Sequence, residues 1–180
     1  QKFKITNAEI RHIKTGSFLR ALSREDGQKG DGTNPALLIL DEYHQHQTTE
    51  FYDLHMGANS KEPLLMIITT AGVDLNCPCY TEEYQYCSNL LNSSVDIQNE
   101  SYWADIMEAE PGDDPGALDT WKAANPIRAF YPGGVEKIRQ AYEVAKTIPE
   151  KMTAYLTKML NIWVQQAENA YMDMAKFKAA

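Results

Sequence analysis

The sequence predicts an α/β protein in which a mostly parallel sheet is followed by a helical segment. Two short apolar runs, Ala36 to Leu40 and Leu64 to Ile68, do not alternate with polar residues, which is typical of strands buried on both faces. Residues 48 to 58 lie between them and have helical spacing. The three segments together form a βαβ unit, which requires parallel strands.

Local signals predict the remaining elements of the first two thirds. Residues 9 to 23 alternate around Lys14-Thr15-Gly16-Ser17 and are expected to form a hairpin. Residues 25 to 35 contain three glycines and are expected to form a polar loop. We expect a helix over residues 81 to 91 and a further strand over residues 102 to 109.

The last third of the chain is predicted to be helical. A helical turn is expected over residues 119 to 124, and longer helices over residues 135 to 145 and 152 to 163. Their apolar faces comprise Val135, Ile138, Tyr142 and Ala145, and Met152, Tyr155, Leu156, Met159, Leu160 and Trp163. We therefore divide the chain into residues 1–115 and residues 116–180.

Composition limits the classes of function. The net charge of -8 disfavours a general nucleic-acid surface, so any DNA-binding face is local or lies outside this segment. The three cysteines suit a reducing compartment, and Cys77-Pro78-Cys79 lacks the second pair of ligands that a zinc site needs. No apolar run approaches the ~18 residues of a membrane helix. No signal peptide is visible, although the chain begins at Gln1 rather than Met.

Asp41 and Glu42 follow the first apolar run directly. The carboxyl end of a parallel strand lies on the ligand side of an α/β sheet. Asp41 can bind Mg²⁺, directly or through water, because this cation prefers oxygen ligands. Glu42 can take a proton from a water that attacks phosphorus. An apolar run followed by Asp-Glu is typical of the B motif of P-loop ATPases.

Thr69 and Thr70 end the second apolar run, at the same predicted edge of the sheet. Hydroxyl groups at this place can sense whether a γ-phosphate is present. The alternative is that Asp41 and Glu42 only begin a loop and cap the next helix, and that the threonines are ordinary strand ends.

Histidines near the acids suggest a different site. Asp41, His44 and His46, together with His55, have ligand types that suit zinc or iron. No second ligand cluster accompanies them, so we favour a surface or partner-facing role for His44 and His46.

Longer stretches resemble a known family. "GDGTNPALLILDEYHQHQTTEFYDLHMGANSKEPLLMIITTAG" resembles the large terminase subunit of tailed bacteriophages, in the HK97-like group. "CPCYTEEYQYC" resembles the family's segment after the coupling motif, and "LDTWKAANP" its linker signature. "IPEKMTAYLTKMLNIWVQQAENAYMDMAKF" resembles the helix that leads into the next domain. The resemblance covers residues 9 to 178.

The resemblance implies a two-part DNA-packaging motor. A P-loop (ASCE) ATPase drives viral DNA into the procapsid, and a nuclease domain with an RNase H-like fold cuts concatemeric DNA. Asp41 matches the Mg²⁺-binding acid, Glu42 the catalytic glutamate, and Thr69, Thr70 and Ala71 the coupling motif. The implied partners are double-stranded DNA, the portal protein, the small terminase subunit and further copies in the motor ring. A phage or prophage protein of this kind works in the cytoplasm of the bacterial host.

Two departures from the family pattern indicate a fragment. The phosphate loop GxxxxGK[ST] does not precede the B motif, and no cluster of nuclease acids follows before Ala180. We therefore expect ATP, Mg²⁺ and the endonuclease to concern the parent protein, and this segment alone to be inactive. The family also uses a trans-acting arginine, for which Arg24 and Arg20 are candidates without a motif to decide between them.

Two rival functions remain at this point. "DEYH" also fits the DExH box of superfamily 2 helicases, although a helicase needs a second RecA-like domain in place of the helical tail. The segment can also be a catalytically silent α/β interaction domain whose helical tail binds a partner.

Overall fold

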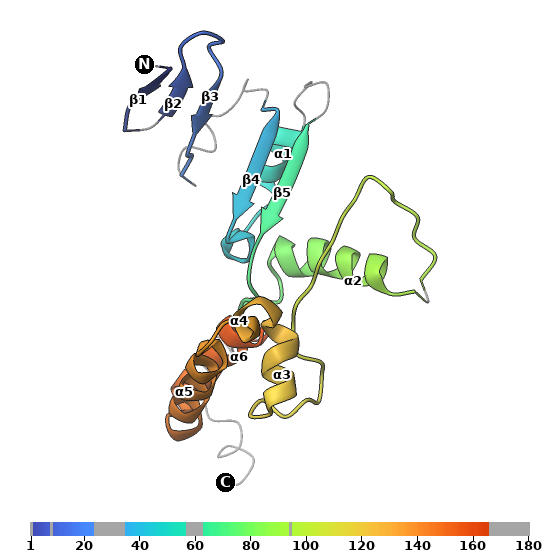
Figure 1. Ribbon diagram of the computed structural model, residues 1–180. Coiled ribbons are helices and arrows are strands. Elements are labelled where there is room, and N and C mark those ends of the chain that lie inside the picture. The colour runs from blue at the N-terminus through green and yellow to red at the C-terminus, as the bar shows by residue number, and fades with distance from the viewer. Residues whose placement is uncertain (1, 8, 24–34, 57–62, 94, 166–180) are drawn as a thin grey trace, which may run out of the picture. The chain divides into compact units, whose positions relative to one another are not determined.

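The computed structural model describes residues 2–7, 9–23, 35–56, 63–93 and 95–165. They form two compact units (Figure 1). The first combines Gln1–Leu40 with Thr48–Met66, and the second combines Asp41–Gln47 with Ile67–Ala180. The predicted loop at residues 25 to 35 lies almost wholly outside the described residues.

An antiparallel sheet occupies the start of the first unit. Its strands β1 (Phe3–Ile5), β2 (Glu9–His12) and β3 (Phe18–Arg20) are paired in the order β1-β2-β3. The predicted hairpin is confirmed as β2 and β3, and Gly16 has a positive φ of 74° in its turn. β1 was not predicted.

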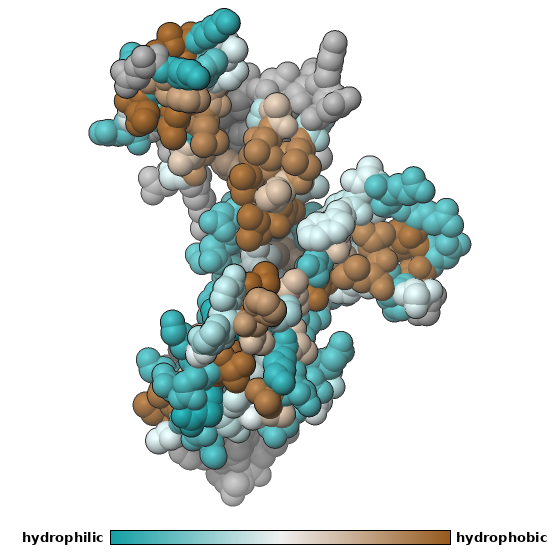
Figure 2. All heavy atoms as spheres, viewed as in Figure 1, coloured by the Kyte–Doolittle hydropathy of each residue, from teal (hydrophilic) through white to brown (hydrophobic). Residues whose placement is uncertain are grey.

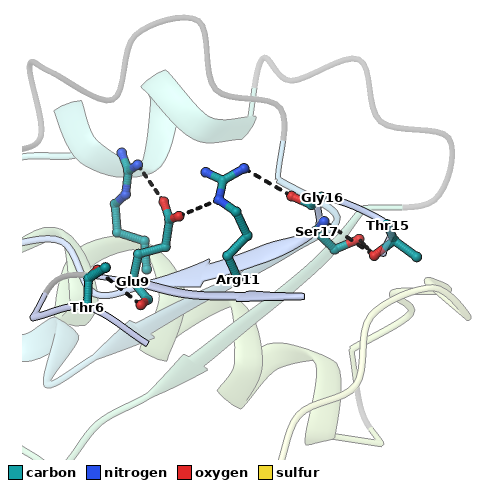
Figure 3. A network of polar contacts seen from close by, with 7 residues as sticks. Thr6, Glu9, Arg11, Thr15, Gly16 and Ser17 are labelled. Carbon is teal, nitrogen blue, oxygen red and sulfur yellow. Dashed lines mark hydrogen bonds and ion pairs between the residues drawn. The ribbon is translucent and has the colours of Figure 1, made fainter. Parts of the chain in front are cut away.

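Glu9 joins two arginines on this small sheet (Figure 3). Its carboxylate accepts from Arg11 Nε at 2.7 Å and from Arg20 Nη2 at 2.8 Å, and these hydrogen bonds lower the pKa of Glu9. Both guanidinium groups also lie over the ring of Phe18, at 5.0 and 5.2 Å. Arg20 is thus bound within its own sheet, whereas Arg24 lies outside the described residues.

The predicted βαβ unit is present. It consists of β4 (Leu37–Asp41), α1 (Glu50–Met56) and β5 (Leu64–Ile68). Leu64 N donates to Ala36 O at 3.0 Å and Glu42 N to Ile68 O at 2.8 Å. From the first bond to the second, the residue numbers increase in both strands, so the strands run parallel, as their arrows show in Figure 1.

The prediction that these strands are buried on both faces is wrong. One face of each strand remains open, and Figure 2 shows apolar side chains gathered over the two strands. The exposed residues, between 43% and 56% accessible, are Leu37, Ile39, Leu64, Met66 and Ile68. Leu40, on the other face, is only 2% exposed. The apolar pattern is typical of a strand that is covered on both faces, but the described residues cover only one face.

A helix and an extended segment begin the second unit after β5. The predicted helix over 81–91 is confirmed, but its start is a π-helical turn, η3 (Cys79–Tyr84), which precedes α2 (Gln85–Leu91). The predicted strand over 102–109 is wrong. This segment is extended and buries alternate side chains, yet it pairs with no strand among the described residues. Its end is bonded to the C-terminal helical segment instead, through Ala109 N and Leu160 O at 3.0 Å.

Helices make up the rest of this unit. They are α3 (Leu118–Ala124), α4 (Pro126–Phe130), α5 (Gly134–Thr147), the 3-10 turn η4 (Pro149–Lys151) and α6 (Met152–Met159). The predicted helices are confirmed, except that α6 ends before Trp163 because Asn161 is left-handed, with φ 54°. No helix among the described residues is long and apolar enough to span a membrane.

The core of the second unit lies between these helices. Ile138 and Leu160 are completely buried there, and Ala145 is 1% exposed. Trp121 Nε1 and Tyr155 Oη both donate to the carbonyl oxygen of Pro115, at 2.8 and 2.7 Å. These two bonds fix the loop before α3 against α6.

Candidate active site

Asp41 and Glu42 lie where β4 ends. Glu42 has a left-handed backbone, with φ 52° and ψ 43°, although it is not a glycine. Such a conformation costs on the order of 1 kcal/mol and persists where neighbouring contacts impose it. Here the constraints are the bond from Glu42 N to Ile68 O and the following 3-10 turn, η2 (Tyr43–Gln45), anchored by the fully buried Tyr43.

The two carboxylates have different surroundings. The Asp41 residue is exposed. The Glu42 side chain is 52% exposed, and its Oε2 lies 3.2 Å from His44 Nδ1. An exposed carboxylate at a strand end is the donor type that Mg²⁺ selects, so Asp41 fits the expected metal ligand.

Thr69, at the end of β5, lies beside this turn. Its Oγ1 accepts from His44 N at 3.0 Å and is 3.0 Å from His44 Nδ1. The same hydroxyl donates to Thr70 O at 3.1 Å. The structure thus brings together the two strand ends that the sequence placed at one edge of the sheet. Ala71, the third member of the proposed coupling motif, is buried.

Lys158 on α6 is a member of this cluster that the sequence did not reveal. Its Nζ donates to Thr70 Oγ1 at 3.0 Å and lies 3.2 Å from His44 Nε2. Lys158 is 114 residues from His44 in the chain, and one lysine on a helix carries no local signal for such a contact.

His44 is enclosed by these groups. Its side chain is only 9% exposed, so the predicted surface role is wrong. Burial lowers the pKa of His44, the positive charge of Lys158 lowers it further, and Glu42 acts in the opposite direction. The imidazole is therefore neutral near pH 7.

A histidine-based metal centre finds no support. The described residues contain no group of three His, Cys, Asp or Glu side chains that could hold a metal ion. The ring of His46 lies 5.1 Å from that of Tyr43, and the side chain of His55 is outside the described part. Cys77 and Cys79 are buried free thiols, and burial raises the pKa of Cys79 to about 12.

Comparison with known proteins identifies the segment that contains this site. Residues 1–89 match the family model described as the ATPase domain of the terminase large subunit. Over these residues the chain is similar to the ATPase domain of terminase large subunits. The matched segment contains both carboxylates and the Thr69–Ala71 stretch, whereas Lys158 lies beyond it.

Two further comparisons extend over most of the chain. Protein YmfN of Escherichia coli (strain K12) is 32% identical over 165 residues, which cover 88% of this chain and 34% of that protein. The crystal structure of the HK97 bacteriophage large terminase aligns with a TM-score of 0.68 and 22% identity, covering 90% of this chain and 33% of that one. At this identity the likeness is one of fold. The chain spans about a third of the length of both relatives.

Proposed function

We propose that this chain is part of an ATP-driven motor that moves phage DNA into procapsids. The observation that supports it most is that Asp41 and Glu42, and Thr69 and Thr70, lie at the ends of two parallel strands that are hydrogen-bonded to each other there. Both strand ends belong to the segment that matches terminase ATPases. The family match also favours a packaging ATPase over a DExH helicase or a silent interaction domain.

Asp41 and Glu42 divide the work of hydrolysis in this proposal. Asp41 holds Mg²⁺, which neutralises charge on the phosphates of ATP when it is bound. Glu42 accepts the proton of the attacking water, because its half-exposed carboxylate can reach a water molecule. The left-handed backbone at Glu42 directs its side chain away from the strand's regular alternation.

Thr69, Thr70 and Ala71 act as the coupling motif. The hydroxyl of Thr69 contacts the turn that follows Glu42, and the hydroxyl of Thr70 contacts α6 through Lys158. These two contacts support the proposal that Thr69 and Thr70 relay a change at the nucleotide to the helical segment.

The remaining parts of the motor belong to a longer protein. We propose that residues 1–115 contribute the rear of the ATPase domain and that residues 116–180 link it to a nuclease domain, which cuts concatemeric DNA. The open apolar face of β4 and β5 is where helices of the rest of the ATPase domain would pack. The phosphate loop GxxxxGK[ST] is absent from this sequence, so the segment alone is inactive.

The partners follow from the same proposal. They are double-stranded DNA, the portal protein, the small terminase subunit and further copies of the protein in the motor ring. The motor works in the cytoplasm of the bacterial host.

The test is ATP turnover by the protein that carries both the phosphate loop and this segment. Glu42→Gln is nearly isosteric and should lower turnover by ~10²–10⁴-fold, the usual contribution of a general base. Glu50→Gln, a change at an exposed acid on α1, is the matched control and should leave turnover unchanged. A decrease below about threefold for Glu42→Gln would refute the assigned role. Mg²⁺-dependent, saturable turnover by the 180-residue chain alone would contradict the fragment proposal.

A further inference from the structure

Lys158 connects α6 to the ends of both β4 and β5. The ammonium group lies 3.2 Å from His44 Nε2 and 3.0 Å from Thr70 Oγ1. His44 in turn faces Glu42 through its other ring nitrogen, at 3.2 Å. A continuous set of polar contacts therefore runs from the Glu42 carboxylate through one imidazole to a helix that lies far away in the sequence.

The contacts determine which ring nitrogen of His44 carries the proton. An ammonium group can only donate, so Nε2 beside Lys158 must be the unprotonated acceptor. The Thr69 hydroxyl gives its hydrogen to Thr70 O, so towards His44 Nδ1 it presents an oxygen lone pair. Nδ1 therefore carries the hydrogen and faces two acceptors, Thr69 Oγ1 and Glu42 Oε2. This assignment follows from the hydrogen-bond network, as tautomers generally must.

Packing keeps the imidazole in this place. A Cβ atom at Gly72 would lie 3.1 Å from His44 Cδ2, so the ring fills the space above that glycine. The Sγ of Cys79 approaches Thr69 Oγ1 at 4.0 Å, next to the same ring. The ring position is thus set by neighbours, whereas the position of its proton is set by Lys158.

We propose that His44 and Lys158 are positioning residues that link the orientation of the Glu42 carboxylate to the position of α6. Lys158 holds His44 as the neutral Nδ1–H tautomer, and this N–H orients the carboxylate that activates water. A displacement of α6 withdraws the ammonium group and frees Nε2 for a proton, which changes the hydrogen bonding of Glu42. The inference rests on the proposed function of Glu42 and adds a route by which the helical segment controls it.

NMR of the 180-residue chain tests whether Lys158 fixes the tautomer of His44, without any assumption about ATP. The ¹⁵N shifts of labelled histidine should show His44 at pH 7 with a protonated Nδ1 and an unprotonated Nε2. In Lys158→Met, protonation of Nε2 should begin at a higher pH than in the unchanged chain. The matched control Lys151→Met, at an exposed lysine of η4, should leave His44 unaltered. A protonated Nε2 in the unchanged chain, or no effect of Lys158→Met, would overturn the inference.

ATP turnover by the longer protein tests whether Lys158 and His44 position the Glu42 carboxylate for hydrolysis. Lys158→Met and His44→Ala should each lower kcat about tenfold, the effect of losing one hydrogen bond to a charged group, with little change in KM. Lys158→Arg retains a donor and should recover most of the loss, which a purely structural role of the side chain does not predict. In the Glu42→Gln background, Lys158→Met should have no further effect, because the carboxylate it positions is gone.

The outcomes separate the two proposals. If Glu42→Gln leaves turnover intact, the proposed function fails. If Glu42→Gln abolishes turnover while Lys158→Met and His44→Ala leave kcat unchanged, only the link to α6 fails.

Discussion

Gly72→Ala should destabilise the chain by crowding two rings at the candidate site. A Cβ at this position would lie 3.1 Å from His44 Cδ2 and 3.1 Å from Trp163 Cζ3. Carbon atoms in good contact are about 3.5–4.0 Å apart, so both rings must move by several tenths of an ångström. Inserting a methyl group into such a packed place costs about 1–3 kcal/mol, and we expect about 2 kcal/mol here.

Urea unfolding of a double-mutant cycle measures this crowding. Trp163→Phe removes the indole atom that the new methyl group meets, so Gly72→Ala should cost about 1 kcal/mol less in that background. Pairs of changes that do not interact add within about 0.5 kcal/mol. An identical cost in the two backgrounds, within that error, would refute the packing explanation.

Three further changes test other parts of the second unit. Tyr155→Phe should lower the free energy of unfolding, measured in urea, by about 1 kcal/mol. One hydrogen bond to Pro115 O is lost, while that oxygen keeps its bond from Trp121. The control Tyr131→Phe, at an exposed tyrosine, should leave the free energy of unfolding unchanged. Ile138→Ala should cost about 2–5 kcal/mol by the same measurement because this side chain is completely buried, and a loss below about 1 kcal/mol would contradict its place in the core. Burial raises the pKa of the Glu108 carboxyl above its ordinary value of 4.5. The folded chain therefore binds the carboxyl proton more tightly than the unfolded chain does. This contribution to stability is complete below pH 4.5 and is lost as pH rises through the pKa of the folded state. The stability of the unchanged chain relative to Glu108→Gln should therefore decrease as pH rises above about 4.5, and an increase would contradict the raised pKa.

The two strand ends of the site could be predicted from the sequence. Each apolar run is short, lacks polar interruptions and stops at a polar pair, Asp41-Glu42 in one case and Thr69-Thr70 in the other. Parallel pairing then follows from the helix between them. The structure shows both strands within one residue of the predicted bounds.

The contacts that complete the site could not be predicted. Lys158 reaches His44 across 114 residues, and only the packing of α6 in the second unit brings them together. A surface or partner-facing role was predicted for His44 because no second cluster of metal ligands accompanies it in the sequence. Its burial depends on Thr69 and on the absence of a side chain at Gly72.

The predicted strand over 102–109 failed for a related reason. Alternating burial is real in this segment, but alternation describes which side chains face inward and not what the backbone pairs with. Met107 O and Ala109 N are bonded to Asn161 and Leu160, at 2.8 and 3.0 Å, and not to a neighbouring strand.

The most direct test of the site is a Mg²⁺ titration of ATP turnover in the longer protein, with Asp41→Asn and Glu42→Gln compared side by side. Our assignment predicts that Asp41→Asn raises the Mg²⁺ concentration needed for half-maximal turnover. Glu42→Gln should lower the maximal rate by ~10²–10⁴-fold while leaving that concentration unchanged. If Glu42→Gln shifted the Mg²⁺ dependence and kept the maximal rate, Glu42 would be a metal ligand and not the base.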